Sequence, residues 1–113
     1  MKIMIVEDNK NTRSLIRSII EPYGLDIVES GNGAEAVADF SAEHPDIVLM
    51  DIEMPEMNGI TATQKIRSSH PAARIFMVTL YGDQDLRKAA KQASAEKFIL
   101  KVDLTELPKL LFE

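Results

Sequence analysis

Hydrophobic residues along this 113-residue chain fall into two alternating kinds of segment. The first kind is a short, continuous apolar run, which is typical of a strand buried on both faces. The second kind has apolar residues every three or four positions over about ten residues, as in an amphipathic helix. The apolar runs lie at residues 3–6, 47–50, 75–78 and 98–100, and a second, shorter strand that contains Asp26 is predicted at residues 25–28.

Capping residues and helix breakers mark the segments between these runs. Asn9 or Asn11 is expected to cap the first helix, and Pro22 to end it. A short last helix is expected to start behind Thr105 as its N-cap. Pro108 is tolerated there, because N–H groups in a first turn have no helical partner.

Strand and helix therefore alternate five times, with no repeat or low-complexity tract between them. This alternation predicts an α/β fold with a parallel sheet and helices on both faces. We expect a doubly wound, flavodoxin-like (βα)5 three-layer sandwich with strand order 2-1-3-4-5. The length fits a single domain over residues 1–113.

Charge and composition narrow the range of partners and locations. The net charge of -5 and the pI of about 5.0 argue against direct nucleic-acid binding by this segment. The chain has no cysteine, which excludes disulfides and thiolate metal sites. No apolar run approaches the ~20 residues of a membrane span or forms a signal-peptide core. These features predict a cytoplasmic protein.

Candidate site residues follow four of the five predicted strands. Strand 1 leads into Glu7 and Asp8, strand 3 into Asp51, strand 4 into Thr79 and strand 5 into Lys101. In the predicted topology all five residues lie at one edge of the sheet, where strands 1 and 3 are neighbours and ligands bind. We expect them to form one site.

Three carboxylates in one site repel each other unless a cation or a shared proton compensates them. Mg2+ fits this need, because it binds a few carboxylates and keeps positions for water and phosphate oxygens. With such a cation present, Asp51 is a candidate nucleophile for a phosphoryl group. Lys101 can bind phosphate oxygens, and the Thr79 hydroxyl can donate to the new phosphate and move its loop.

The chain resembles a response regulator receiver domain over essentially its whole length. Each matching motif is short, but five of them occur in the right order. They are Ile5-Val6-Glu7-Asp8-Asn9, Gly31-Asn32-Gly33-Ala34-Glu35-Ala36, the stretch from Ile47 to Asn58-Gly59, Met77-Val78-Thr79, and Lys97-Phe98-Ile99-Leu100-Lys101.

The resemblance implies a phosphorylation-dependent switch rather than a conventional enzyme. Asp51 would be phosphorylated by a sensor histidine kinase or a phosphotransfer protein. The expected Mg2+ ligands are Glu7, Asp8, Asp51 and the backbone carbonyl of Glu53.

The resemblance also implies a route from the site to a partner. Thr79 and Phe98 match the family's coupled switch pair. The surface of the fourth helix, fifth strand and fifth helix would carry the signal, often through a homodimer. DNA would be a partner only through an additional output domain. The sequence is compatible with a free-standing receiver and with part of a longer regulator.

Four positions depart from the usual family pattern. Leu80 stands where a small residue is common, and a bulky side chain there is expected to restrict access of a phosphodonor or of water. Val102 replaces a common proline, so the last loop should differ. Ser94 replaces a common glycine. Glu7 replaces the more usual aspartate and keeps the carboxylate.

Two other classes of function are considered. Leu80 and Val102 are compatible with a receiver-like interaction module that no longer takes phosphate. An enzyme of the same architecture is the other class. A flavodoxin needs a hydroxyl- and glycine-rich loop after strand 1, and a haloacid dehalogenase-type phosphatase needs Asp-x-Asp there. The segment Glu7-Asp8-Asn9 fits neither.

Overall fold

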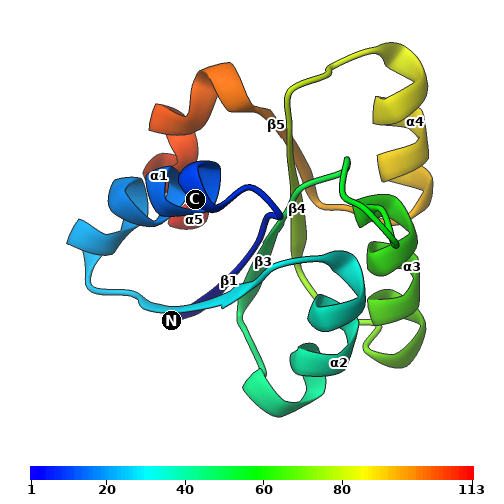
Figure 1. The fold of residues 1–113 in the computed structure, drawn as a ribbon, viewed down its shortest axis with the longest axis horizontal. Coiled ribbons are helices and arrows are strands. Elements are labelled where there is room, and N and C mark those ends of the chain that lie inside the picture. The colour runs from blue at the N-terminus through cyan, green and yellow to red at the C-terminus, as the bar shows by residue number, and fades with distance from the viewer.

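A computed structural model describes all residues from 1 to 113 (Figure 1). The five strands form one parallel sheet in the order β2-β1-β3-β4-β5, so the predicted topology is confirmed. The strands are β1 (Lys2–Val6), β2 (Asp26–Ser30), β3 (Ile47–Met50), β4 (Ile75–Thr79) and β5 (Lys97–Leu100). The helices are α1 (Lys10–Ile20), α2 (Gly33–Glu43), α3 (Gly59–Ser69), α4 (Gln84–Gln92) and α5 (Leu107–Leu111).

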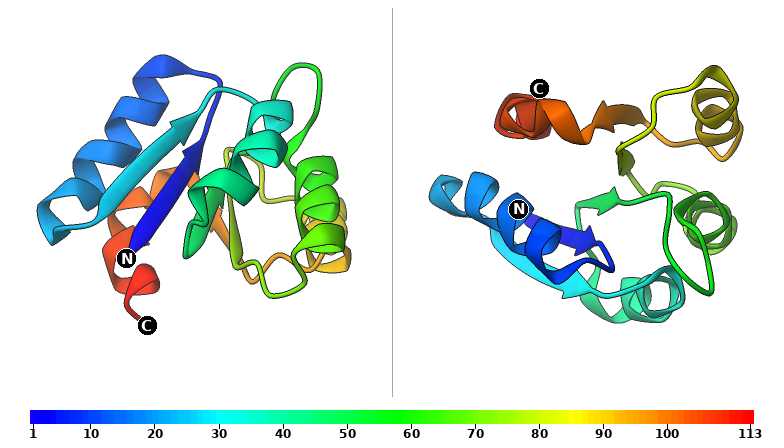
Figure 2. Two further views of the ribbon diagram at one scale, coloured as in Figure 1. Left: turned by 90° about the horizontal axis from the view of Figure 1, so that it is seen from below. Right: turned by 45° about the horizontal axis from the view of Figure 1, so that its top comes forward.

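Helices cover both faces of the sheet, which gives the three expected layers (Figures 1 and 2). Strand residues alternate between two cores, because successive side chains point to opposite faces of a sheet. In β1, for example, Met4 and Val6 pack with α2, α3 and α4, whereas Ile3 and Ile5 pack with α1 and α5. The central strands β3 and β4 are therefore buried at every position, as their continuous apolar runs indicated.

Two predicted boundaries were wrong in detail. Strand β2 starts at Asp26 rather than residue 25 and runs on to Ser30, because its ladder with β1 extends from Lys2↔Asp26 to Val6↔Ser30. Thr105 is not an N-cap but lies inside a 3-10 segment, Lys101–Glu106, which leads directly into α5. Pro108 does lie in the first turn of α5, as expected.

The predicted cap of the first helix is confirmed. Asn9 caps α1, since its side chain accepts a hydrogen bond from the backbone N–H of Thr12. The side chain of Asn58 caps α3 in the same way, because it accepts a hydrogen bond from the backbone N–H of Thr61. No helix of the chain is both long enough and apolar enough to cross a membrane.

Strand register brings the polar strand ends to one edge. Val6 lies beside Met50 in the β1–β3 ladder, so the residues that follow them, Glu7 and Asp51, leave the sheet side by side. Thr79 pairs with Leu100 in the β4–β5 ladder, directly before Lys101. The parallel sheet therefore delivers all of these side chains to its carboxyl edge.

Candidate functional site

A cavity of about 300 Å³ opens at the carboxyl edge of the sheet. The structure brings together in it six of the seven residues that the sequence singled out, and Phe98 alone lies elsewhere. Those six are Glu7, Asp8, Asp51, Glu53, Thr79 and Lys101, and the cavity is completed by Asn9, Thr12, Leu80 and Tyr81.

Lys101 lies between the two most buried carboxylates of the cavity. Its Nζ is 2.6 Å from Glu7 Oε1 and 3.4 Å from Asp51 Oδ1. Glu7 and Asp51 are only 1% and 5% exposed, so both charges are largely removed from water. The single ammonium group is therefore shared unequally, and Glu7 holds the shorter contact.

This unequal sharing sets the protonation of the site. Burial, followed by repulsion from Glu7, raises the pKa of Asp51 from 3.8 to about 7, although Lys101 opposes the change. Burial alone would also raise the pKa of Glu7, but the Lys101 ammonium and the Asn9 N–H together hold it below its ordinary value. Burial would lower the pKa of Lys101, yet the two carboxylates raise it. The site thus keeps Lys101 and Glu7 charged while it disfavours the Asp51 anion.

The oxygens of this site fit a hard divalent cation. One carboxylate oxygen from each of Glu7, Asp8 and Asp51 lies within 4.8 Å of the others. Glu7 Oε1 is buried and is paired with the Lys101 ammonium. Burial and the neighbouring Glu7 also raise the pKa of Asp8. Three carboxylates with a single ammonium group between them are consistent with a Mg2+ site.

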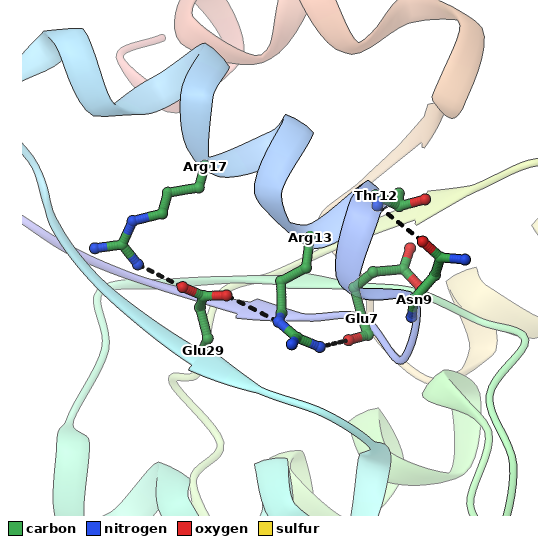
Figure 3. Close-up of polar contacts among 6 residues, drawn as sticks. All are labelled: Glu7, Asn9, Thr12, Arg13, Arg17 and Glu29. Carbon is green, nitrogen blue, oxygen red and sulfur yellow. Dashed lines mark hydrogen bonds and ion pairs between the residues drawn. The ribbon is translucent and has the colours of Figure 1, made fainter.

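The loop that carries Glu7 is held by an ionic network on α1 and β2 (Figure 3). Arg13 donates from Nη1 to the backbone carbonyl of Glu7 at 2.8 Å and from Nε to Glu29 at 2.8 Å. Glu29 also accepts from Arg17 at 2.5 Å. In addition, the N–H of Asn9 donates to Glu7 Oε2 at 3.1 Å. These contacts fix both the main chain and the carboxylate of Glu7.

The loop after Asp51 is held by close backbone approach. The N–H of Gly59 donates to the Ile52 carbonyl at 2.8 Å, and a Cβ atom at this position would overlap the Asp51 carbonyl oxygen. Glycine is therefore required here by space. Asp51 itself is anchored by its N–H, which donates to the Val6 carbonyl at 3.0 Å.

Comparison with known proteins assigns the chain to a family. Residues 3–112 match the response regulator receiver domain. The chain belongs to this family. It is 43% identical over 101 residues to the chemotaxis protein CheY of Bacillus subtilis (strain 168), with 88% of this chain and 84% of that protein covered. As a receiver domain it is a two-component signalling switch and not a conventional enzyme.

Solved structures of receiver domains share the fold. A LuxR-family two-component response regulator from Aurantimonas sp. SI85-9A1 superposes with a TM-score of 0.93 at 33% identity, covering 98% of this chain and 81% of that one. The CheX-CheY-BeF3-Mg+2 complex from Borrelia burgdorferi gives a TM-score of 0.90 at 28% identity, covering 100% and 90%. A Mg2+ complex is thus known for a protein similar to this receiver.

Several features of this receiver site were not found from the sequence. Thr12 lines the cavity from the first turn of α1, and no motif marked it. Tyr81 also lines the cavity while it stays 53% exposed, and no motif marked it either. Phe98 lies away from the cavity, half-buried on β5, with the guanidinium of Arg87 over its ring at 4.6 Å. Only the folded arrangement of α4 and β5 reveals the role of Arg87 in this contact.

Proposed function

We propose that this receiver domain takes a phosphoryl group on Asp51, with a sensor histidine kinase or a phosphotransfer protein as donor. The observation that carries the proposal is the setting of Asp51. It is a buried carboxylate that opens on a polar cavity, next to two further acids and 3.4 Å from the Lys101 ammonium. An acidic loop residue without a chemical role needs no such surroundings.

The reaction forms a bond between an Asp51 oxygen and phosphorus. The bond from phosphorus to the donor nitrogen breaks, and its electron pair stays with the donor imidazole. Lys101 binds phosphate oxygens, so it must turn from Glu7 toward the new group. Glu7, Asp8, Asp51 and the backbone carbonyl of Glu53 would hold Mg2+. When bound, Mg2+ supplies positive charge to the phosphate oxygens and offsets the repulsion among the carboxylates.

The response begins at Thr79 and ends at the helical surface. Thr79 is 1% exposed and lines the cavity, and its hydroxyl oxygen accepts a hydrogen bond from the Tyr81 N–H at 3.4 Å. Donation of the hydroxyl hydrogen to the phosphate would draw the loop after β4 inward. Phe98 on β5 would respond as the second member of the switch pair. The surface of α4, β5 and α5 would then bind an output partner or domain, or a second copy of the receiver.

The acceptor role is tested with a small phosphodonor. The protein is incubated with acetyl phosphate and Mg2+, quenched in acid, and measured by intact mass. We expect one added phosphoryl group on the wild type, none on Asp51→Asn, and none when EDTA replaces Mg2+. A wild type that stays unmodified, while another receiver in the same tube gains phosphate, would exclude this function.

The alternative of an interaction module that takes no phosphate is tested in the same protein. Leu80 motivates this alternative, yet it is 63% exposed at the rim of the cavity and does not fill it. The alternative predicts partner binding or dimerisation that ignores both beryllofluoride and Asp51→Ala. We expect instead that beryllofluoride and Asp51→Ala both change partner binding or dimerisation.

Glu53 is proposed to influence the lifetime of the phosphate. Its side chain is exposed and the residue lines the cavity, so its charge lies near the path of an attacking water. We expect Glu53→Ala to change the dephosphorylation rate, measured by loss of the added mass after the donor is removed. Unchanged thermal unfolding would show that the fold is intact, and an unchanged rate would exclude the role. The cytoplasmic location, and any output domain in a longer regulator, stay predictions.

A further inference from the structure

Arg87 makes two contacts that join three parts of the switch region. From α4, its Nε donates to the Gly82 carbonyl in the β4–α4 loop at 2.9 Å. Its guanidinium also lies over the ring of Phe98 on β5, with Cζ 4.6 Å from the ring centroid. A planar guanidinium suits this combination, because it can donate in its plane while its face stacks on an aromatic ring. We call the contacts of Arg87 with Gly82 and Phe98 the Arg87 latch.

The loop is shaped to allow the latch. A Cβ atom at Gly82 would lie 2.8 Å from a methyl carbon of Leu100 and 3.1 Å from Arg87 Nη2. Gly82 therefore fits between β5 and the guanidinium only because it has no side chain. Its φ is not positive, so the requirement is one of space and not of backbone conformation.

The latch holds the same loop that phosphorylation must move. Residues 80–82 follow Thr79 directly, and the Thr79 hydroxyl is engaged within this loop by the Tyr81 N–H at 3.4 Å. If Thr79 moves toward a phosphate on Asp51, the chain after it must follow, and the Gly82 carbonyl then leaves Arg87. A change in the position of the Phe98 ring would also disturb its contact with the guanidinium.

We propose that the Arg87 latch stabilises the unphosphorylated conformation of the receiver and sets how much of the activated conformation is present before phosphorylation. This rests on the proposed function, in which Thr79 and Phe98 change position together. Arg87 touches neither the cavity nor Asp51, so it acts as a regulatory residue and not as part of the chemistry. Removing the latch should favour the activated conformation, and any ligand specific to that conformation should then bind more tightly.

The test uses the full chain and beryllofluoride with saturating Mg2+, followed through the backbone amides of Tyr81 and Gly82 by NMR. An exposed cation–π contact and one hydrogen bond together predict about fivefold tighter binding for Arg87→Ala. Arg87→Lys keeps the charge but not the planar geometry, and should give a smaller effect. Lys88→Ala is the control, because Lys88 is the exposed neighbour on the same helix. It should bind like the wild type.

A second variant and a second readout ensure that the test does not depend on Arg87→Ala alone or on binding affinity alone. Gly82→Ala should push the loop off Arg87 and tighten binding in the same direction. In the absence of beryllofluoride, the Gly82 and Phe98 amide signals of Arg87→Ala should shift toward their positions in the liganded wild type. Equal or weaker binding by Arg87→Ala would overturn the latch while the function stands. A wild type that binds no beryllofluoride would overturn the function itself, and the latch with it.

Discussion

Replacing Asp51 with asparagine should stabilise the metal-free protein at neutral and alkaline pH. The reason is that the fold raises the pKa of this buried carboxyl from 3.8 to about 7, chiefly by burial and then by the charge of Glu7. Between these values the folded protein holds a proton that the unfolded chain releases. This contribution to stability is fully present below about pH 4 and is lost as the pH rises through 7. Asparagine has no proton to lose.

The magnitude follows from the same two pKa values. A rise from 3.8 to about 7 corresponds to about 4 kcal/mol against the ionised form. We expect roughly half of this, about 2 kcal/mol, because water in the open cavity screens the charge and asparagine loses the attraction of Lys101. By linkage, about one third of the difference is present at pH 5 and nearly all of it at pH 8.

Urea unfolding followed by circular dichroism measures this difference. Wild type and Asp51→Asn are compared in EDTA at pH 5 and pH 8, with exposed Asp26→Asn as the matched control. The advantage of Asp51→Asn should grow between the two pH values and shrink when Mg2+ is added, since a bound cation stabilises the ionised wild type. The reasoning is refuted if the two proteins lose stability in parallel from pH 5 to pH 8.

Four further substitutions follow from backbone geometry and from the network on α1. Ser94 has a left-handed backbone with φ 68, so Ser94→Gly should raise the free energy of unfolding by about 1 kcal/mol. Ser14→Gly within α1 should lower it by about the same amount in the same urea experiment. Gly59→Ala should cost about 3 kcal/mol or prevent folding, because its Cβ would overlap the Asp51 carbonyl; thermal unfolding decides this. Arg13→Ala should weaken Mg2+ binding about threefold in calorimetry, because the Glu7 loop loses its anchor.

The sheet and the site edge could be predicted because both depend on simple regularities. Continuous apolar runs such as residues 47–50 identify strands covered on both faces, and parallel strands place their following residues at one edge. The position of Asp51 next to Glu7 follows from these regularities alone. Strand β2 was placed less well, because it is an edge strand with few buried residues and a weak apolar signal.

Side-chain pairing within the site could not be predicted in the same way. Lys101 is closer to Glu7 than to Asp51, and this depends on side-chain lengths and on the loop that Arg13 anchors. Arg87 was missed because its partners lie five and eleven residues away, on other elements. Ser94 stood out only as a departure from a family glycine, and its left-handed backbone explains why glycine is common there.

The unfavourable electrostatics of the cavity are what make the receiver responsive. Asp51 is deeply buried, and the one nearby ammonium group contacts Glu7 at the shorter distance. A fully compensated Asp51 would gain little from a cation or from a new charge-assisted contact with Lys101. Because the charge of Asp51 is only partly compensated, a bound cation changes the relative free energies of the unphosphorylated and activated conformations. A phosphoryl group that attracts Lys101 does the same. The receiver can then use a local charge change at the sheet edge to move the β4–α4 loop, against the opposing contacts of Arg87.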